Sequence, residues 1–326
     1  MSADAHPPDE ARPALPDAPP SPAGLPNVVV PEGEPEAVDK PMSGEVHLDV
    51  ELDTALDAGE DEPSGPVARI LVTAFGSTDP GRRRQHNEDA MASIANEVFV
   101  IADGMGGYAA GEVASQMAID VMTAAFETQH FGTLEPSLPR RGAELVGAIK
   151  LANRAIHEQA RSNEAQAGMG TTVVAARFSR GRQRVYIAHV GDSRCYRLRD
   201  GIMTQLTTDH TLASLGITGP ASHRLVRALG VHPEVDVDLR IDTALDGDVY
   251  LLCSDGLSKM VPERVIADVV QNAADLQAAV TELIRRANDA GGRDNVSVIL
   301  VRVDDVATGQ RGSTGSDPGP FPTRAG

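Results

Sequence analysis

Two apolar segments of this sequence end in the same dipeptide, Asp-Gly. Residues 98–102 run into Asp103-Gly104, and residues 249–254 run into Asp255-Gly256. Apolar runs of this length bounded by turn residues predict buried strands. A carboxylate at the end of a buried strand is costly unless it is paired or binds a metal. Asp294 precedes a third apolar run, residues 296–301, so the three aspartates together predict a shared cation site at strand ends.

The two ends of the chain differ in composition from its middle. Residues 1–66 hold 13 of the 22 prolines and 16 acidic residues against 2 basic ones, a net charge of −14 within a total of −18. Such a segment buries too little apolar surface to fold, so we expect a disordered, acidic, proline-rich arm over 1–66. Residues 305–326 have no apolar period and are predicted to be a disordered tail. One folded domain is expected over 67–304.

Composition also indicates the cellular compartment and the kinds of partner to expect. Only Cys195 and Cys253 are present, which argues against a secreted disulfide framework. The sequence has no apolar run of about 18 residues, and its N-terminus lacks a basic segment followed by an apolar one. We expect a cytoplasmic protein, monomeric, without a membrane or nucleic-acid partner.

The order of the predicted elements indicates the fold class. Strands are predicted over 69–75, 98–103, 171–178, 184–190 and 249–254, and a hairpin over 193–206 turns at Asp200-Gly201. Helical spacing relates Val113, Met117, Val121 and Ala124, and again Leu145, Ile149, Ala152 and Ile156. Two more helices are expected over 263–270 and 276–287, with Gly291-Gly292 as a stop. This pattern predicts an antiparallel or mixed sheet structure with helices packed outside it.

Three other chemistries compete for parts of the sequence. Residues 104–109 fit a dinucleotide-binding glycine pattern, but the acidic residue that it needs would fall near Glu127, where helical residues continue. A cysteine phosphatase needs Arg six positions after its Cys, and here those positions are Gly201 and Lys259. Paired acids over 236–240 resemble an aspartyl-phosphate motif, but alternation with apolar residues indicates a half-exposed strand.

A carboxylate-bridged pair of metals uses the residues that these alternatives leave unexplained. Oxygen-only ligands suit Mg²⁺ and Mn²⁺. Two such ions about 3.5–4 Å apart can hold a shared water and direct the resulting hydroxide at phosphorus. This chemistry needs no protein nucleophile.

Seven short motifs occur in an order that resembles the metal-dependent protein phosphatases, the type 2C or PPM family, and their bacterial serine/threonine phosphatases in particular. They are residues 78–89, Asp103-Gly104-Met105-Gly106-Gly107, Gly170-Thr171-Thr172, Gly191-Asp192-Ser193-Arg194, residues 206–210, Ser254-Asp255-Gly256 and Asp294-Asn295. The resemblance extends from Leu71 to Val303. It implies an α+β fold, a four-layer α/β/β/α sandwich of two antiparallel β-sheets flanked by helices.

The resemblance also implies a function, hydrolysis of phosphoserine and phosphothreonine in proteins by a hydroxide that bridges two Mn²⁺ or Mg²⁺ ions. Phosphorylated proteins, including serine/threonine kinases and their substrates, would be its partners in signalling. The implied metal ligands are Asp103, the Gly104 carbonyl, Asp255 and Asp294, with Asp192 matching the position that helps to hold a third ion. The implied catalytic residues are Arg84, which would bind the substrate phosphate, and Glu88 and Asp89, which would orient metal-bound waters.

Two departures from the family pattern bear on mechanism. Met105 stands where many members have a histidine that is a candidate general acid, which leaves His86 and His210 as candidates by their place in the sequence. The flap segment 211–225 is also shorter than in bacterial relatives, and it borders the channel in the family.

Two functions of other kinds remain as alternatives. A non-catalytic phosphoprotein-binding module could use the same fold, although no ligand aspartate is missing. The acidic arm could also be the main interaction element, docking on a basic partner or on the basic loop at 82–84.

Overall fold

The computed structural model describes residues 42–44, 70–106, 110–179 and 183–305. Of the predicted arm 1–66, only strand β1 (Met42–Gly44) falls among them, paired antiparallel with β2. The rest of the arm and the tail from 306 lie outside the described residues. Every other helix and strand described lies between Ile70 and Asp305, so β12 extends one residue beyond the predicted domain 67–304.

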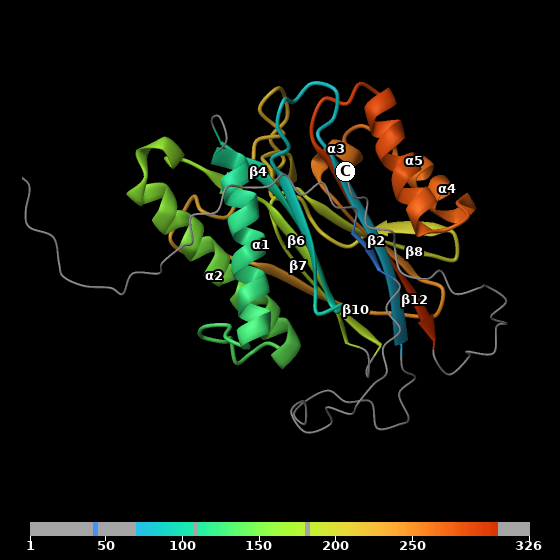
Figure 1. The fold of residues 1–326 in the computed structure, drawn as a ribbon, viewed down its shortest axis with the longest axis horizontal. Helices are drawn as coiled ribbons and strands as arrows, with labels where there is room; N and C mark the ends of the chain where they lie inside the picture. The colour runs from blue at the N-terminus through green and yellow to red at the C-terminus, as the bar shows by residue number, and fades with distance from the viewer. Residues whose placement is uncertain (1–41, 45–69, 107–109, 180–182, 306–326) are drawn as a thin grey trace, which may run out of the picture. The chain divides into compact units, whose positions relative to one another are not determined.

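Two antiparallel β-sheets form the centre of the domain (Figure 1). The first has the strand order β1-β2-β12-β11-β8-β9, and the second has the order β10-β7-β6-β4-β3, with the short β5 paired to β4. The strands of the first sheet are β2 (Ile70–Asp79), β8 (Arg194–Arg199), β9 (Ile202–Gln205), β11 (Val249–Cys253) and β12 (Val296–Asp305). Those of the second are β3 (Asp89–Ile94), β4 (Val98–Met105), β5 (Gly170–Thr171), β6 (Val173–Ser179), β7 (Arg184–Val190) and β10 (Asp238–Thr243).

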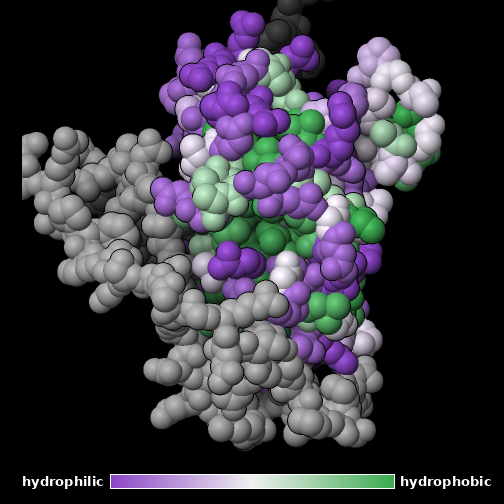
Figure 2. All heavy atoms as spheres, turned by 90° about the vertical axis from the view of Figure 1, so that its right-hand side faces the viewer, coloured by the Kyte–Doolittle hydropathy of each residue, from purple (hydrophilic) through white to green (hydrophobic). Residues whose placement is uncertain are grey.

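Helices cover the outer face of each sheet (Figure 1). The second sheet is covered by α1 (Ala110–Thr128) and α2 (Arg140–Ser162). The first is covered by α3 (Asp255–Ser258), α4 (Glu263–Asn272) and α5 (Leu276–Asp289). Short 3₁₀ turns occur at Glu164–Gln166 and Ala213–Leu215. Figure 2 views the side that carries α4 and α5, where hydrophilic side chains predominate.

Apolar side chains from alternate strand positions fill three layers. In β4, Val98 and Val100 face α1 and α2, whereas Phe99 and Ile101 face the opposite sheet. Strands covered on both faces must be apolar at every position, which explains the unbroken runs in the sequence. The predicted four-layer α/β/β/α sandwich is confirmed.

The structure corrects two details of the predicted elements. No strand was predicted from the sequence over 89–94, but Asp89 opens β3 there. Helix α1 forms as expected, yet its buried face is shifted by one position. Ala114, Ala118 and Met122 are fully buried, while Ala124 is exposed. Small side chains on this face let the helix lie close to the sheet.

The other predicted elements are confirmed. The hairpin turns at Asp200 and Gly201, which have positive φ values of 50° and 79°. Leu145, Ile149, Ala152 and Ile156 are all fully buried on α2. The half-exposed strand indicated over 236–240 forms two to three residues later, as edge strand β10 at Asp238–Thr243, and four of its six residues are exposed. After α5, the amide of Gly292 donates to the carbonyl of Ala287 and closes the helix. Among the described residues, no helix is long and apolar enough to cross a membrane.

Candidate active site

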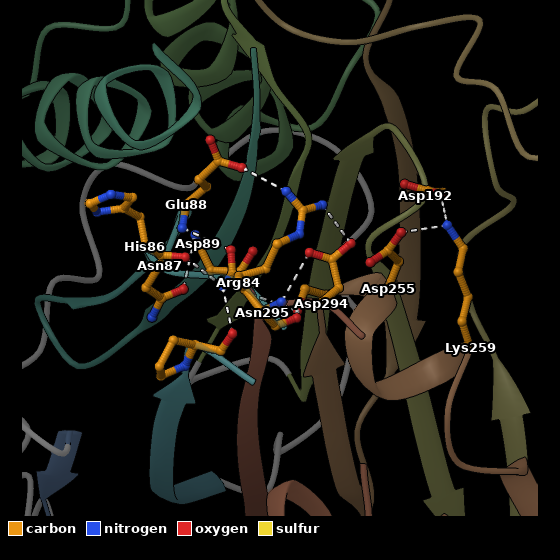
Figure 3. A network of polar contacts seen from close by, with 12 residues as sticks. Arg84, His86, Asn87, Glu88, Asp89, Asp192, Asp255, Lys259, Asp294 and Asn295 are labelled. Carbon is orange, nitrogen blue, oxygen red and sulfur yellow. Dashed lines mark hydrogen bonds and ion pairs between the residues drawn. The ribbon is translucent and has the colours of Figure 1, made fainter. Parts of the chain in front are cut away.

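The predicted carboxylates converge at one edge of the sandwich. Asp103 lies in β4, directly opposite Asp89 in β3. From the other sheet, Asp255 begins α3 and Asp294 precedes β12, while Asp192 lies between β7 and β8. Figure 3 shows Asp192, Asp255 and Asp294 in one row with Arg84. The structure therefore brings together side chains that lie up to two hundred residues apart in the sequence.

Asp103 does not end its strand, because β4 continues to Met105. Its backbone is held from the neighbouring segment, where the Thr172 amide and the Thr171 hydroxyl both donate to the Asp103 carbonyl at 2.9 Å. The next residue, Gly104, donates its amide to the Glu88 carbonyl at 2.9 Å. These contacts fix the proposed ligand residues 103 and 104 against the loop that carries Glu88.

Arg84 links two of the carboxylates. Its Nη1 lies 3.3 Å from Glu88 Oε2, and its Nη2 lies 3.0 Å from Asp294 Oδ2 (Figure 3). The side chain is 45% exposed, so the guanidinium remains accessible from solvent. Both ion pairs leave further N–H groups of its planar fork for an anionic ligand.

Asp89 is buried in a network of hydroxyl groups. Its Oδ2 accepts hydrogen bonds from Ser254 Oγ at 2.8 Å and from Ser297 Oγ at 2.7 Å. Thr78 Oγ1 lies 2.7 Å from Ser297 Oγ and accepts a hydrogen bond from Asn87 at 2.8 Å. The other carboxylate oxygen of Asp89, Oδ1, is buried with no hydrogen-bond partner among the described residues.

Asn295 anchors the loop that carries Arg84 and Glu88. Its Oδ1 accepts from the Glu88 amide at 2.8 Å, and its Nδ2 donates to the carbonyls of Pro80 at 3.0 Å and His86 at 2.9 Å. The residue is 3% exposed. Only the motif Asp294-Asn295 pointed to this residue in the sequence, without indicating its role.

Burial raises the pKa values of the acids in this cluster. Desolvation raises the pKa of Asp89 to about 7, although the hydrogen bonds from the two serine hydroxyls lower this pKa by favouring the ionised form. Desolvation and then the charge of Asp89 raise the pKa of Asp103 well above its usual range. Burial likewise raises the pKa of Asp255, opposed by Lys259, and that of Glu88, opposed by Arg84. Ionised carboxylates are therefore costly here without additional positive charge.

This donor set fits divalent cations. Six carboxylates, including Glu88, share the site with two cationic side chains, Arg84 and Lys259, which leaves a formal charge of −4 when all are ionised. The unpartnered Asp89 Oδ1 lies in the same cluster. Oxygen-only sites of high negative charge suit Mg²⁺ and Mn²⁺.

Lys259 was not identified from the sequence as a site residue. Its Nζ lies 3.0 Å from Asp192 Oδ2 and also contacts Asp255 Oδ2 (Figure 3). Its position four residues after Asp255 is the only local signal, because residues four apart on a helix face the same side. Ser297 was missed as well, since its hydroxyl meets Asp89 across the two sheets.

His210 supports the loop that carries Asp192. The Gly191 amide donates to His210 Nδ1 at 3.0 Å, and the His210 amide donates to the Gly191 carbonyl at 2.9 Å. With Nδ1 accepting, the proton of the neutral ring is on Nε2, which lies 3.2 Å from Asp238 Oδ2. Desolvation lowers the pKa of His210 and favours this neutral form.

His189, His210 and Asp238 place potential ligand atoms within 4.8 Å of one another. These groups already have partners. His189 Nε2 lies 2.8 Å from the Thr208 carbonyl, and Arg227 donates to Asp238. The cluster is thus a hydrogen-bonded support behind the Asp192 loop.

The structure contradicts two of the rival chemistries. Strand β4 is flanked only by antiparallel neighbours, β3, β5 and β6, whereas a dinucleotide fold needs parallel strands. Cys195 and Cys253 are buried, and burial raises the pKa of the Cys253 thiol to about 12 and that of Cys195 further still. Neither thiol is available as a nucleophile.

A pocket of about 600 Å³ opens beside Met105, lined mainly by residues between Arg224 and Asp236. The flap segment 211–225 precedes this wall and is closed on itself by a bridge between Thr211 and Leu225. Its exposed apolar side chains include Leu215 and Ile217.

Comparison with known proteins agrees with this geometry. Residues 81–300 match the family model described as protein phosphatase 2C. The chain is 40% identical over 240 residues to the serine/threonine phosphatase Stp of Listeria innocua, covering 69% of this chain and 93% of that protein.

Solved structures show the same fold. The Mycobacterium tuberculosis serine/threonine phosphatase PstP/Ppp superposes with a TM-score of 0.63 at 37% identity, over 72% of this chain and 99% of that one. The catalytic domain of PstP in complex with two manganese ions matches with a TM-score of 0.62 at 38% identity, over 72% of this chain and all of that one.

Proposed function

The chain belongs to the protein phosphatase 2C family, and on this premise we propose that it is a metal-dependent serine/threonine protein phosphatase. It would hydrolyse phosphoserine and phosphothreonine in phosphorylated proteins. The observation that carries the proposal is the convergence of six carboxylates from both sheets beside one accessible arginine. Carboxylates that collect cations and a guanidinium that binds phosphate are the two parts that a metal-assisted phosphomonoesterase needs.

The residues that would hold two Mn²⁺ or Mg²⁺ ions are Asp103, Gly104 through its carbonyl, Asp255 and Asp294. Asp103 and Gly104 come from β4 of the second sheet, whereas Asp255 follows β11 and Asp294 precedes β12 of the first sheet. When bound, such a pair of ions polarises phosphoryl oxygens and lowers the pKa of a water between them. The fit is supported by the raised pKa values of Asp103 and Asp255, which added positive charge would reverse.

Arg84 would bind the substrate phosphate. Its planar guanidinium can donate two parallel hydrogen bonds to phosphate oxygens, which an ammonium cannot do in the same fixed geometry. Its contacts with Glu88 and Asp294 place it at the edge of the carboxylate cluster. Glu88 and Asp89 would accept hydrogen bonds from water in the site and so orient it toward the phosphorus atom.

The structure supports neither His86 nor His210 as the general acid. Both ring nitrogens of His210 have partners within the support behind Asp192. The imidazole of His86 points away from Asp255 and Asp294 (Figure 3). We therefore propose that the leaving alkoxide takes its proton from water in the open site, which Glu88 and Asp89 help to order.

The pocket beside Met105 gives room for the polypeptide around a phosphorylated residue. The substrates that we propose include serine/threonine kinases and the proteins that they phosphorylate, and the enzyme would act as a monomer in the cytoplasm. Asp192 matches the position that would help to hold a third ion, but Lys259 already contacts its carboxylate.

Phosphopeptide hydrolysis under defined metal conditions tests this function. Phosphothreonine and phosphotyrosine peptides should be assayed with Mn²⁺, with Mg²⁺ and with a chelator. We expect hydrolysis of the phosphothreonine peptide that requires added metal. Asp255→Asn should lower that activity by at least about 100-fold, since even partners of metal ligands cost 10–100-fold when mutated.

Asp268→Asn is the matched control, because it makes the same chemical change at an exposed position on α4. It should retain wild-type activity. Activity in the presence of chelator, or wild-type turnover by Asp255→Asn, would overturn the proposed site. Binding of the phosphopeptide without turnover would favour a non-catalytic binding module instead.

A further inference from the structure

One ammonium group lies between two of the clustered carboxylates. Lys259 Nζ donates to Asp192 Oδ2 at 3.0 Å and to Asp255 Oδ2 (Figure 3). The two acids come from different segments, the loop between β7 and β8 and the start of α3. Lys259 thus links these two segments through its ion pairs with Asp192 and Asp255.

Asp192 depends on this lysine for its charge compensation. Its side chain is only 5% exposed, and Lys259 is its sole ion-pair partner among the described residues. A buried carboxylate without a partner is strongly unfavourable. The Lys259 side chain itself is 40% exposed, and its ammonium, a cation at neutral pH like that of any ordinary lysine, lies between the two carboxylates.

The same two acids would be needed by a further metal ion. Asp192 corresponds to the position expected to hold a third cation, and Asp255 is the nearest acid that shares its lysine. A divalent cation between these oxygens would lie within contact range of the ammonium, and like charges at that separation repel strongly in a partly buried site. One position cannot serve both cations.

We propose that Lys259 is a positioning residue whose ammonium takes the place of a third metal ion between Asp192 and Asp255. This inference rests on the proposed function of the neighbouring two-metal site. Lys259 neutralises Asp192, holds Asp255 through Oδ2 and leaves the other carboxylate oxygen, Oδ1, to the metal pair. The enzyme would then work with two exchangeable ions and a built-in cation.

Counting bound Mn²⁺ tests the inference independently of catalysis. The full chain should be titrated with Mn²⁺ by isothermal calorimetry, with native mass spectrometry as a second count. We expect about two ions per wild-type chain and about three for Lys259→Gln. The added site should bind at least about tenfold more tightly than any further site in the wild type, because a neighbouring like charge shifts such equilibria by tenfold or more.

Three variants separate this role from a merely structural one. Lys259→Arg keeps the charge and should restore the wild-type count. Lys259→Gln combined with Asp192→Asn should lose the added ion, because the second acid is gone. Lys150→Gln is the matched control, since it makes the same charge change on α2, where Lys150 pairs with Glu135 and with none of the proposed metal ligands. It should leave the count unchanged.

The outcomes also distinguish this inference from the proposed function. A wild-type chain that already binds three ions, or a Lys259→Gln variant that gains none, would overturn the role of Lys259. If the wild type nevertheless hydrolyses phosphopeptides only when Mn²⁺ is added, the proposed function stands. A wild-type chain that binds no Mn²⁺ would overturn both.

Discussion

Asn295 should be one of the most sensitive positions outside the metal ligands. Its amide makes three hydrogen bonds, to the Glu88 amide and to the carbonyls of Pro80 and His86. Asn295→Ala removes all three at a site that is 3% exposed. At about 1 kcal/mol each, with a further cost for the groups left unpaired, the free energy of unfolding should fall by about 2–4 kcal/mol. For a domain of this size the melting temperature should fall by about 5–15 °C.

The same change should weaken substrate binding. The loop held by Asn295 carries Arg84 and Glu88, so its release would displace the guanidinium from the carboxylate cluster. Displacements of about 1 Å can cost about 100-fold in rate. We expect kcat/KM for a phosphothreonine peptide to fall by about 10–100-fold, even at temperatures where the variant is folded.

Urea denaturation and steady-state kinetics measure the two effects separately. Asn272→Ala is the control, because the Asn272 side chain bonds only to Asp268, one turn earlier at the exposed end of α4. That variant should lie within about 0.5 kcal/mol of the wild type. An Asn295→Ala protein with wild-type stability would refute the proposed anchoring, and a destabilised variant with unchanged kcat/KM would refute its link to Arg84.

Two further predictions concern charge. Arg84→Ala should mainly raise KM, because phosphate binding is lost while the metal ligands remain. The Mn²⁺ affinity should not fall, since a cation beside Asp294 has been removed. Arg83→Ala, in the same exposed loop, is the control, and an unchanged KM in Arg84→Ala would contradict the phosphate-binding role. In chelator-treated protein, burial raises the pKa of Asp89 to about 7 in the folded state, against 3.8 for the free side chain. Between about pH 4 and about pH 7 the folded state therefore binds a proton that the unfolded state has lost. The free energy of unfolding should fall as the pH rises from about 4 to about 7. Saturating Mn²⁺ should abolish that slope, and a chelator-treated protein whose stability rises over this interval would contradict the assignment.

The sheets were predictable wherever burial on both faces made a strand continuously apolar. Strands β4, β11 and β12 satisfy this condition, and their central residues are fully buried. Strand β3 was not predictable, because its sequence of Asp, Ala, Met, Ala, Ser and Ile has weak strand propensity. It forms because residues 89–94 pair along β4. Tertiary context thus supplied what local preference did not.

The acidic residues of the site were predictable because short motifs contain them. The residues that contact and position these acids were not predictable. Lys259 and Ser297 carry no motif of their own, and a lysine after a helix or a serine in a strand is unremarkable in a sequence. Their roles follow from contacts across 67 residues, between Lys259 and Asp192, and across 208 residues, between Ser297 and Asp89. Only the folded chain brings these partners together.

The two Asp-Gly pairs illustrate the same limit, because their glycines share a role that turn chemistry does not predict. A Cβ atom on Gly104 would lie 2.1 Å from the Gly111 carbonyl oxygen in α1 and 2.6 Å from that of Glu88, and one on Gly256 would lie 1.9 Å from the Asn295 carbonyl oxygen. Gly256 is the second residue of α3 and packs against the segment that carries Asp294. Each glycine therefore lets its aspartate approach a second acidic segment more closely than any side chain would allow. The close spacing of carboxylates on which cation binding depends is thus set by the residue after each aspartate as much as by the aspartate itself.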